Sequence, residues 1–285
     1  MNRIVAIPAL VSLLVLTGCT GAGGNPPGTG GTPTSAVKTP SEAATEDDTV
    51  VADEPLPVGL CGQAPAPLSD QRVYQGSKET DCGQARDALT AFGRGEDSVD
   101  ESGHGTLVDG WSCVFPMDNE IVDYAITLSC EKGGQRFVLR PRSVAVPAGY
   151  AVLPWDYEGT ATGAAGIYFT TESRKHHCSF TETELGCDNF NFPDDLPPVR
   201  YMGQPQQPTA IVLEPQGSPR FEVYGDPTFT QYSDSGEWGA DTRVLGYGEV
   251  LWVRGIGCTT DPDRGVVCTN GQHGFEISSK RYAIN

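Results

Sequence analysis

Positive charge is scarce in this sequence. Its 285 residues hold 19 Lys and Arg against 37 Asp and Glu, which gives a formal net charge of −18 at pH 7. Proteins that bind nucleic acid or anionic lipid through charge need a basic surface. The composition therefore argues against a nucleic-acid partner and against electrostatic adhesion to anionic membranes.

Long apolar runs are also missing. The apolar stretch at residues 4–16 is shorter than the roughly 20 residues that a membrane-spanning helix needs. A positive charge at Arg3 precedes it, and small residues follow it at Thr17 and Gly18. This architecture predicts a signal peptide at residues 1–18.

Familiar catalytic signatures are absent as well. The chain has no Gly-x-Ser-x-Gly elbow, phosphate-binding glycine loop or zinc helix motif. None of its four histidines stands beside a nucleophile in a recognisable motif. The adjacent His176 and His177 would point to opposite faces of a strand, and Cys178 is expected to be oxidised, so a shared zinc site is disfavoured. We predict no catalytic residue, metal or cofactor, and we favour a binding protein over an enzyme.

Cysteine, by contrast, is abundant, with nine residues. The stretch Leu16-Thr17-Gly18-Cys19 resembles the lipobox of bacterial lipoproteins, which implies a diacylglycerol thioether on Cys19 and usually a further acyl chain, such as palmitate, on its amine. Setting Cys19 aside leaves eight cysteines, an even number that can pair fully in an oxidising compartment. The alternative is an ordinary secreted protein in which Cys19 is incidental.

Residues 19–57 follow as a tract rich in Gly, Pro and Thr. Its few bulky apolar side chains cannot bury a core, so we predict a disordered tether between the lipid and the folded part. The expected location is the outer face of the bacterial cell membrane, lipid-anchored and extracytoplasmic.

Residues 58–145 are predicted to form a small α+β domain, a helix on an antiparallel sheet. Thr80 or Asp81 can cap a helix whose apolar positions recur at spacings of three and four, and Gly93 can end it. Period-two patterns predict strands at 107–115, 122–130 and 136–139. Cys82 and Cys113 lie on the faces that should meet, which favours Cys82–Cys113 and leaves Cys61–Cys130. The two other connectivities stay open.

Residues 146–164 contain several Pro and Gly and are predicted to be a linker. Beyond it, residues 165–285 alternate short strands with turn signals, as in an all-β sandwich or barrel. The expected strands are 167–170, 175–181, 184–187, 210–213, 220–224, 250–257, 265–269 and 274–278. Two cysteine pairs flank hairpins, which predicts Cys178–Cys187 and Cys258–Cys268.

Two stretches resemble uncharacterised exported domain families of actinobacteria. In residues 61–130 the resemblance rests on Cys61-Gly62, Thr80-Asp81-Cys82, Gly110-Trp111-Ser112-Cys113 and Cys130. In residues 165–285 it rests on Tyr168-Phe169-Thr170, Gly186-Cys187-Asp188, Ala240-Asp241-Thr242, Leu245-Gly246-Tyr247-Gly248, Gly257-Cys258, Gly265-Val266-Val267-Cys268 and His273-Gly274-Phe275. Members of the second family often carry a further cysteine pair, which this chain lacks. The resemblance implies fold and export but no activity.

Tryptophans give the candidate binding surface. Trp111 and Trp252 fall in expected strands, whereas Trp155 and Trp238 fall in expected loops and are the better candidates for contact with a partner. We predict a non-enzymatic envelope lipoprotein that binds a protein, peptide or glycan. The alternative is a cell-wall-modifying hydrolase that works through Asp and Glu residues.

Overall fold

The computed structural model describes residues 56–99, 105–161, 164–233 and 235–285. The chain divides into two units, Met1–Ala52 and Asp53–Asn285, and all described residues belong to the second. The predicted signal peptide, the lipidation site Cys19 and nearly all of the tether lie outside the described residues. The described residues form mainly β-sheet with two α-helices, as the α+β prediction requires.

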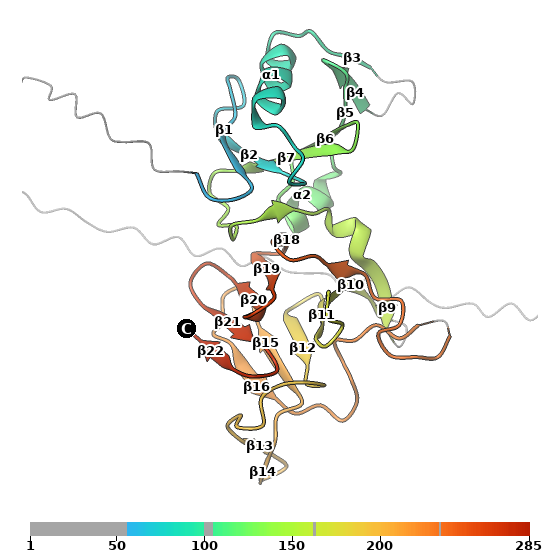
Figure 1. Cartoon of the computed structure of the whole chain (residues 1–285), viewed down its shortest axis with the longest axis vertical. Coiled ribbons are helices and arrows are strands. Elements are labelled where there is room, and N and C mark those ends of the chain that lie inside the picture. Colours follow the sequence, from blue (N-terminus) through green and yellow to red (C-terminus); the bar gives the residue numbers. More distant parts are fainter. Residues whose placement is uncertain (1–55, 100–104, 162–163, 234) are drawn as a thin grey trace, which may run out of the picture. The chain divides into compact units, whose positions relative to one another are not determined.

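The N-terminal part is a seven-stranded antiparallel sheet in the order β1-β2-β7-β6-β5-β4-β3 (Figure 1). Its strands are β1 (Leu60–Gln63), β2 (Gln71–Gln75), β3 (Ser98–Val99), β4 (Gly105–Val108), β5 (Trp111–Val114), β6 (Leu128–Lys132) and β7 (Gln135–Pro141).

Helix α1 (Cys82–Gly93) lies against this sheet and confirms the predicted helix (Figure 1). The Asp81 side chain accepts hydrogen bonds from the backbone N–H groups of Gly83 and Gln84, which are donors that the helix itself leaves unpaired. Leu89 is buried on the helix and belongs to the same core cluster as Trp111 and Phe137 of the sheet. The amphipathic pattern therefore identified the correct face.

Helix α2 (Asp118–Tyr124) corrects the strand predicted at 122–130. The Glu120 carboxylate accepts the backbone N–H of Met117 at 2.7 Å, which closes the first turn. Ala125 adopts a left-handed conformation and ends the helix. Alternation of apolar residues through this stretch was misleading because these local caps favour a helix, and strand β6 begins only at Leu128.

The C-terminal part contains two larger sheets. One has the order β16-β15-β12-β11-β10-β17, with β9 also paired to β10, and the other has the order β22-β21-β20-β19-β18-β8. The strands of the first are β9 (Glu158–Ala161), β10 (Ala164–Thr171), β11 (His177–Phe180), β12 (Leu185–Asp188), β15 (Ala210–Leu213), β16 (Arg220–Glu222) and β17 (Val244–Leu245). Those of the second are β8 (Tyr150–Ala151), β18 (Glu249–Val253), β19 (Ile256–Asp261), β20 (Gly265–Thr269), β21 (Gly274–Ile277) and β22 (Tyr282–Ile284). A separate hairpin joins β13 (Val199–Tyr201) to β14 (Gln204–Gln206).

Residues 146–164, predicted as a linker, take part in these sheets. Strand β8 pairs in parallel with β18, and β9 pairs with β10. Between them a 3-10 helix, η1 (Pro154–Tyr157), buries Tyr157. This stretch therefore supplies structure to the C-terminal part.

One core joins the two predicted domains. Val138 of β7 and Ile126, from the N-terminal part, belong to the same buried cluster as Phe169 of β10 and Leu251 of β18. Phe137 and Leu139, which alternate with Val138 along β7, belong to the core under α1. The N-terminal sheet therefore buries both of its faces.

The four disulfides correct two predictions and confirm two. Cys61 bonds to Cys82 and Cys113 bonds to Cys130, so the predicted pairs Cys82–Cys113 and Cys61–Cys130 are wrong. Cys113 and Cys130 lie directly opposite each other on β5 and β6, 4.0 Å apart at Cα, so the cross-strand bond forms instead. The predicted Cys178–Cys187 and Cys258–Cys268 are present, each also joining directly opposed strand residues.

Within the described residues no strand order closes on itself into a barrel. The same part of the chain has no helix that is long and apolar enough to cross a membrane.

Candidate functional site

The two faces of the seven-stranded sheet around β10 differ in character. Register places Phe169, Cys178, Cys187 and Ile211 in one row across the strands, facing the core. The adjacent rows are Thr170, His177, Asp188 and Ala210 on one side and Tyr168, Ser179, Gly186 and Val212 on the other. Because side chains alternate, Tyr168 and Thr170 lie on the face away from the core. We call this the outer face.

A long segment covers the outer face. The described residues of 223–243, between β16 and β17, form no strand, and we call this stretch the covering segment. Phe229 packs so closely on Gly186 that a Cβ there would lie 2.2 Å from its ring. Likewise, a Cβ on Gly239 would lie 2.3 Å from the His177 ring. Glycine at position 186 therefore allows the covering segment to sit directly on the sheet.

Asp188 anchors the covering segment to the sheet through hydrogen bonds. It is buried, and its carboxylate accepts the backbone N–H groups of Thr228 and Phe229 and the hydroxyl of Thr230, at 2.6–3.1 Å. Burial raises the pKa of Asp188, and these hydrogen bonds oppose the rise. The residue acts as a fixed acceptor that orders residues 228–230.

The two neighbouring histidines contact different partners. The buried His176 ring stacks on Phe192, and His177 meets Phe190 edge-on. Burial lowers the pKa of His176 to about 4 and also lowers that of His177, so both are neutral at pH 7. Among the described residues no group of three or more His, Cys, Asp or Glu is arranged to hold a metal ion.

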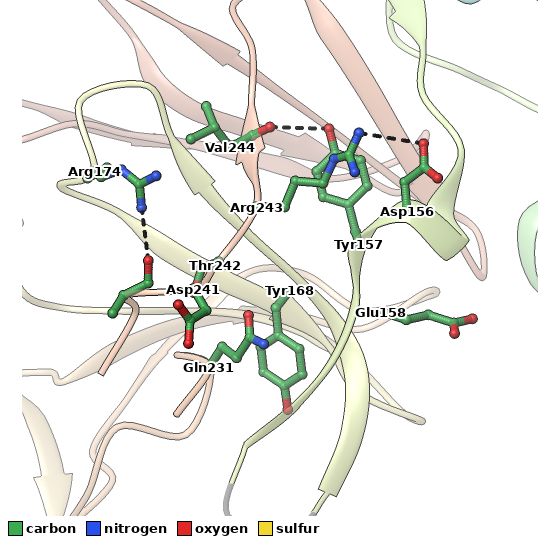
Figure 2. Close-up of a pocket in the computed structure, with 11 residues that line it drawn as sticks. Asp156, Tyr157, Glu158, Tyr168, Arg174, Gln231, Asp241, Thr242, Arg243 and Val244 are labelled. Atoms are coloured by element: carbon green, nitrogen blue, oxygen red, sulfur yellow. Dashed lines mark hydrogen bonds and ion pairs between the residues drawn. The ribbon is translucent and has the colours of Figure 1, made fainter. Parts of the chain in front are cut away.

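A polar cleft of about 430 Å³ opens at one end of the covering segment (Figure 2). It is lined by residues 156–158, Tyr168, Arg174, Gln231 and 240–244. These come from η1 and the start of β9, the outer face of β10, the turn after β10, the covering segment and the start of β17. Parts of the chain that are far apart in sequence thus converge on one cavity.

One wall of the cleft is held by charge and ring contacts. Arg243 lies 3.7 Å from the Asp156 carboxylate and places its guanidinium carbon 5.2 Å from the centre of the Tyr157 ring (Figure 2). Asp156 also lies 3.8 Å from Arg136 of β7. The Tyr157 hydroxyl donates to the carbonyl of Val244 at 3.3 Å, and burial raises its pKa. This wall is fixed before any ligand arrives.

The opposite side combines an aromatic ring with hydrogen-bonding groups. A Cβ on Gly159 would lie 2.8 Å from Gln231 Nε2 and 3.2 Å from the Tyr168 ring, so these two side chains flank the same glycine. Thr242 is only 2% exposed, and its Oγ1 has no hydrogen-bond partner. Asp241, next to it, is exposed. The cleft therefore contains a buried hydroxyl that still has hydrogen bonds to make.

A second cavity, of about 580 Å³, shares Glu158 with the polar cleft. It is bounded by Tyr124, Arg254 and residues of β10 and β11. Arg254 binds Asp123 through two hydrogen bonds, of 3.1 and 2.9 Å, and donates to the carbonyl of Thr181. The lining of this second cavity is less polar than that of the cleft, and the guanidinium of Arg254 is already paired with Asp123.

The two predicted binding tryptophans lie in different settings. Trp155 is half-buried in η1 and packs against Tyr124, with ring centres 6.1 Å apart. Trp238 is 38% exposed and pairs edge-on with Tyr232 at 4.8 Å. Tyr232 and Trp238 are partners in an isolated bridge, and neither lines the polar cleft. The exposed pair thus forms a surface separate from the cleft. Of the nearby acids Asp234, Glu237 and Asp241, the first lies outside the described residues.

The sequence did not predict the cleft, although two of the family-like triplets contribute residues to it. Tyr168 belongs to the triplet Tyr168-Phe169-Thr170, and Asp241 and Thr242 belong to Ala240-Asp241-Thr242, two triplets on which the resemblance rests. The structure brings these triplets together at one cavity. Comparison with known proteins adds nothing further: no family model, curated protein or solved structure matches the chain.

Proposed function

We propose that this protein is a non-enzymatic binding protein of the bacterial envelope and that its ligand occupies the polar cleft. The observation that carries the proposal is the convergence of polar side chains from separate segments on a preformed cavity. Ligand sites are typically concave, largely preformed and about 300–1,000 Å³ in volume, and the cleft meets these criteria. The wall made by Asp156, Arg243 and Tyr157 gives it rigidity.

The proposed location is the outer face of the cell membrane, with a lipid on Cys19. Four disulfides indicate an oxidising, extracytoplasmic environment. Several acyl chains would hold the protein firmly, because each buried methylene adds about 0.8 kcal/mol. Cys19→Ser should move the protein from the detergent phase to the aqueous phase; retention in the detergent phase would contradict lipidation.

The finer architecture is part of the same proposal. We infer that the two sheets of the C-terminal part form a sandwich, because Phe169 and Ile211 of one share a core with Leu251 and Phe275 of the other. Such packing would give the cleft a rigid base.

Sedimentation with insoluble envelope material tests the binding function. The Cys19→Ser protein, free of its lipid, should still sediment with cell envelopes. Gln231→Ala should reduce this, whereas the matched control Gln204→Ala, on the exposed strand β14, should not. Equal retention of both variants, or no retention of the parent, would contradict the proposal.

The same assay separates the hydrolase alternative. A hydrolase would release soluble fragments from the envelope, and Glu158→Gln or Asp241→Asn would abolish the release. A binding protein releases none. Asp156, the third carboxylate of the cleft, is already paired with Arg243 and Arg136.

A further inference from the structure

We propose that the polar cleft binds a neutral saccharide, recognised through its hydroxyl groups; this inference rests on the proposed binding function. The first observation is the chemistry of the lining. Carboxylates, guanidiniums, an amide and hydroxyls face the same cavity, so hydrogen-bond donors and acceptors alternate around it. A ligand that fits such a lining carries donors and acceptors on most of its edges, as a sugar does and an apolar molecule does not.

Charge restricts the ligand further. Asp156 is offset by Arg243, while Glu158 and Asp241 face the cleft together with Arg174, whose Nη1 donates to the carbonyl of Ala240 at 3.4 Å. The chain as a whole carries a formal charge of −18. A phosphorylated or sulfated ligand would meet carboxylates in the cleft and a repulsive field around it. The charges therefore disfavour an anionic ligand, and the alternating hydrogen-bonding groups suit a neutral one.

Tyr168, which is 4% exposed, brings an aromatic ring to the lining among these polar groups. Gly159 and Gly166 flank it: a Cβ on the first would come within 3.2 Å of the ring, and a Cβ on the second within 3.1 Å. Gln231 lies beside the same ring, as Figure 2 shows. An aromatic ring with an amide beside it matches a sugar, whose C–H groups present an apolar face and whose hydroxyls project at the edge.

Thr242 provides the observation that is independent of the charged groups. Thr242 is a lining residue of the cleft and is almost completely buried, and its hydroxyl has no hydrogen-bond partner. Buried polar atoms are nearly always paired, so an exception at a cavity points to a missing partner. A hydroxyl can donate and accept at once, and a sugar hydroxyl can do the same in return.

Saccharide titration of the full chain tests this assignment. The probes are glucose, galactose, mannose, arabinose and N-acetylglucosamine, with glucose 6-phosphate as an anionic probe and trialanine as a zwitterionic peptide probe. Saturation-transfer NMR at up to about 10 mM detects binding even when Kd is millimolar. We expect at least one neutral sugar to bind. Thr242→Val and Gln231→Ala should each weaken it about tenfold, the effect of losing one or two hydrogen bonds.

Matched controls keep the outcomes distinct. Thr183→Val makes the same change at an exposed site on the β11–β12 turn and should leave the affinity unchanged. Asp241→Asn is a further cleft variant, and it alters no buried group. Failure of every neutral sugar to bind overturns the inference. So does tighter binding of glucose 6-phosphate or of trialanine. Equal binding by the cleft variants and Thr183→Val overturns it as well. If envelope sedimentation still depends on Gln231 in those cases, the binding function stands and only the ligand class is wrong.

Discussion

Arg140 of β7 lies buried with its guanidinium carbon 5.5 Å from the centre of the Trp252 ring on β18. Its Nη1 donates to the carbonyl of Tyr124 at 2.6 Å, whereas its Nε and Nη2 have no hydrogen-bond partner. Burial lowers the pKa of Arg140 to about 10, so the side chain is still charged at pH 7. A buried cation that rests on an aromatic ring therefore joins the two predicted domains.

This contact predicts strong coupling between the two residues. Trp252→Leu should destabilise the protein by about 2–4 kcal/mol, because it removes ring packing and leaves the cation uncompensated. In an Arg140→Met background the same change should be milder by about 1 kcal/mol or more, since no charge remains. Urea unfolding of the four proteins of the cycle measures this difference. Additive effects would show that the ring does not stabilise the cation.

Connectivity in the N-terminal part gives a second prediction. Under non-reducing conditions, trypsin cleaves at Arg72 between Cys61 and Cys82, and cyanogen bromide cleaves at Met117 between Cys113 and Cys130. Mass spectrometry should therefore find the fragments of each pair still linked. A fragment that links Cys82 to Cys113 would contradict the structure. Loss of the Cys61–Cys82 bond in a double Ala variant should lower stability by about 3 kcal/mol.

These cysteines illustrate what the sequence could and could not predict. Cys178–Cys187 and Cys258–Cys268 flank short hairpins, so local geometry determines the pairing. Cys113 and Cys130 are separated by helix α2, whose residues 122–124 continue the apolar alternation of a strand. Because this helix was predicted as part of a strand, the register that places Cys113 opposite Cys130 could not be predicted.

The cleft was harder to predict for a different reason. Its lining residues come from segments with no shared periodicity, and Tyr168 and Thr242 meet only because the covering segment crosses the outer face of the sheet. Close approach at Gly186 and the acceptors of Asp188 produce that crossing. Neither effect can be seen in a residue pattern, although Asp188 and Thr242 both belong to triplets that resemble the exported family.

Acid should weaken the fold through His176. The folded-state pKa of about 4 lies below the ordinary 6.5, so the unfolded chain binds the proton more readily. The contribution of His176 to stability is complete above pH 6.5 and is lost as the pH falls toward 4. The loss should be about 3 kcal/mol, or up to 1.4 kcal/mol per pH unit. His176→Phe should flatten the pH dependence of unfolding between pH 6.5 and 4, and His273→Gln should not. Parallel curves for His176→Phe and wild type would contradict this assignment.

The covering segment should loosen when its buried acceptor is removed. Asp188→Ala leaves the N–H groups of Thr228 and Phe229 and the Thr230 hydroxyl without the carboxylate, and each unpaired buried donor costs about 1–3 kcal/mol. Hydrogen exchange at residues 228–230 should become faster, while β18 and β19, in the other sheet, should keep their protection. Asp188→Asn retains one acceptor oxygen and should give an intermediate effect. If exchange rises equally in both sheets, Asp188 stabilises the whole fold and not the covering segment in particular. Since Gln231 and Thr242 belong to that segment, loosening that substantially populates the open form should also weaken binding at the cleft.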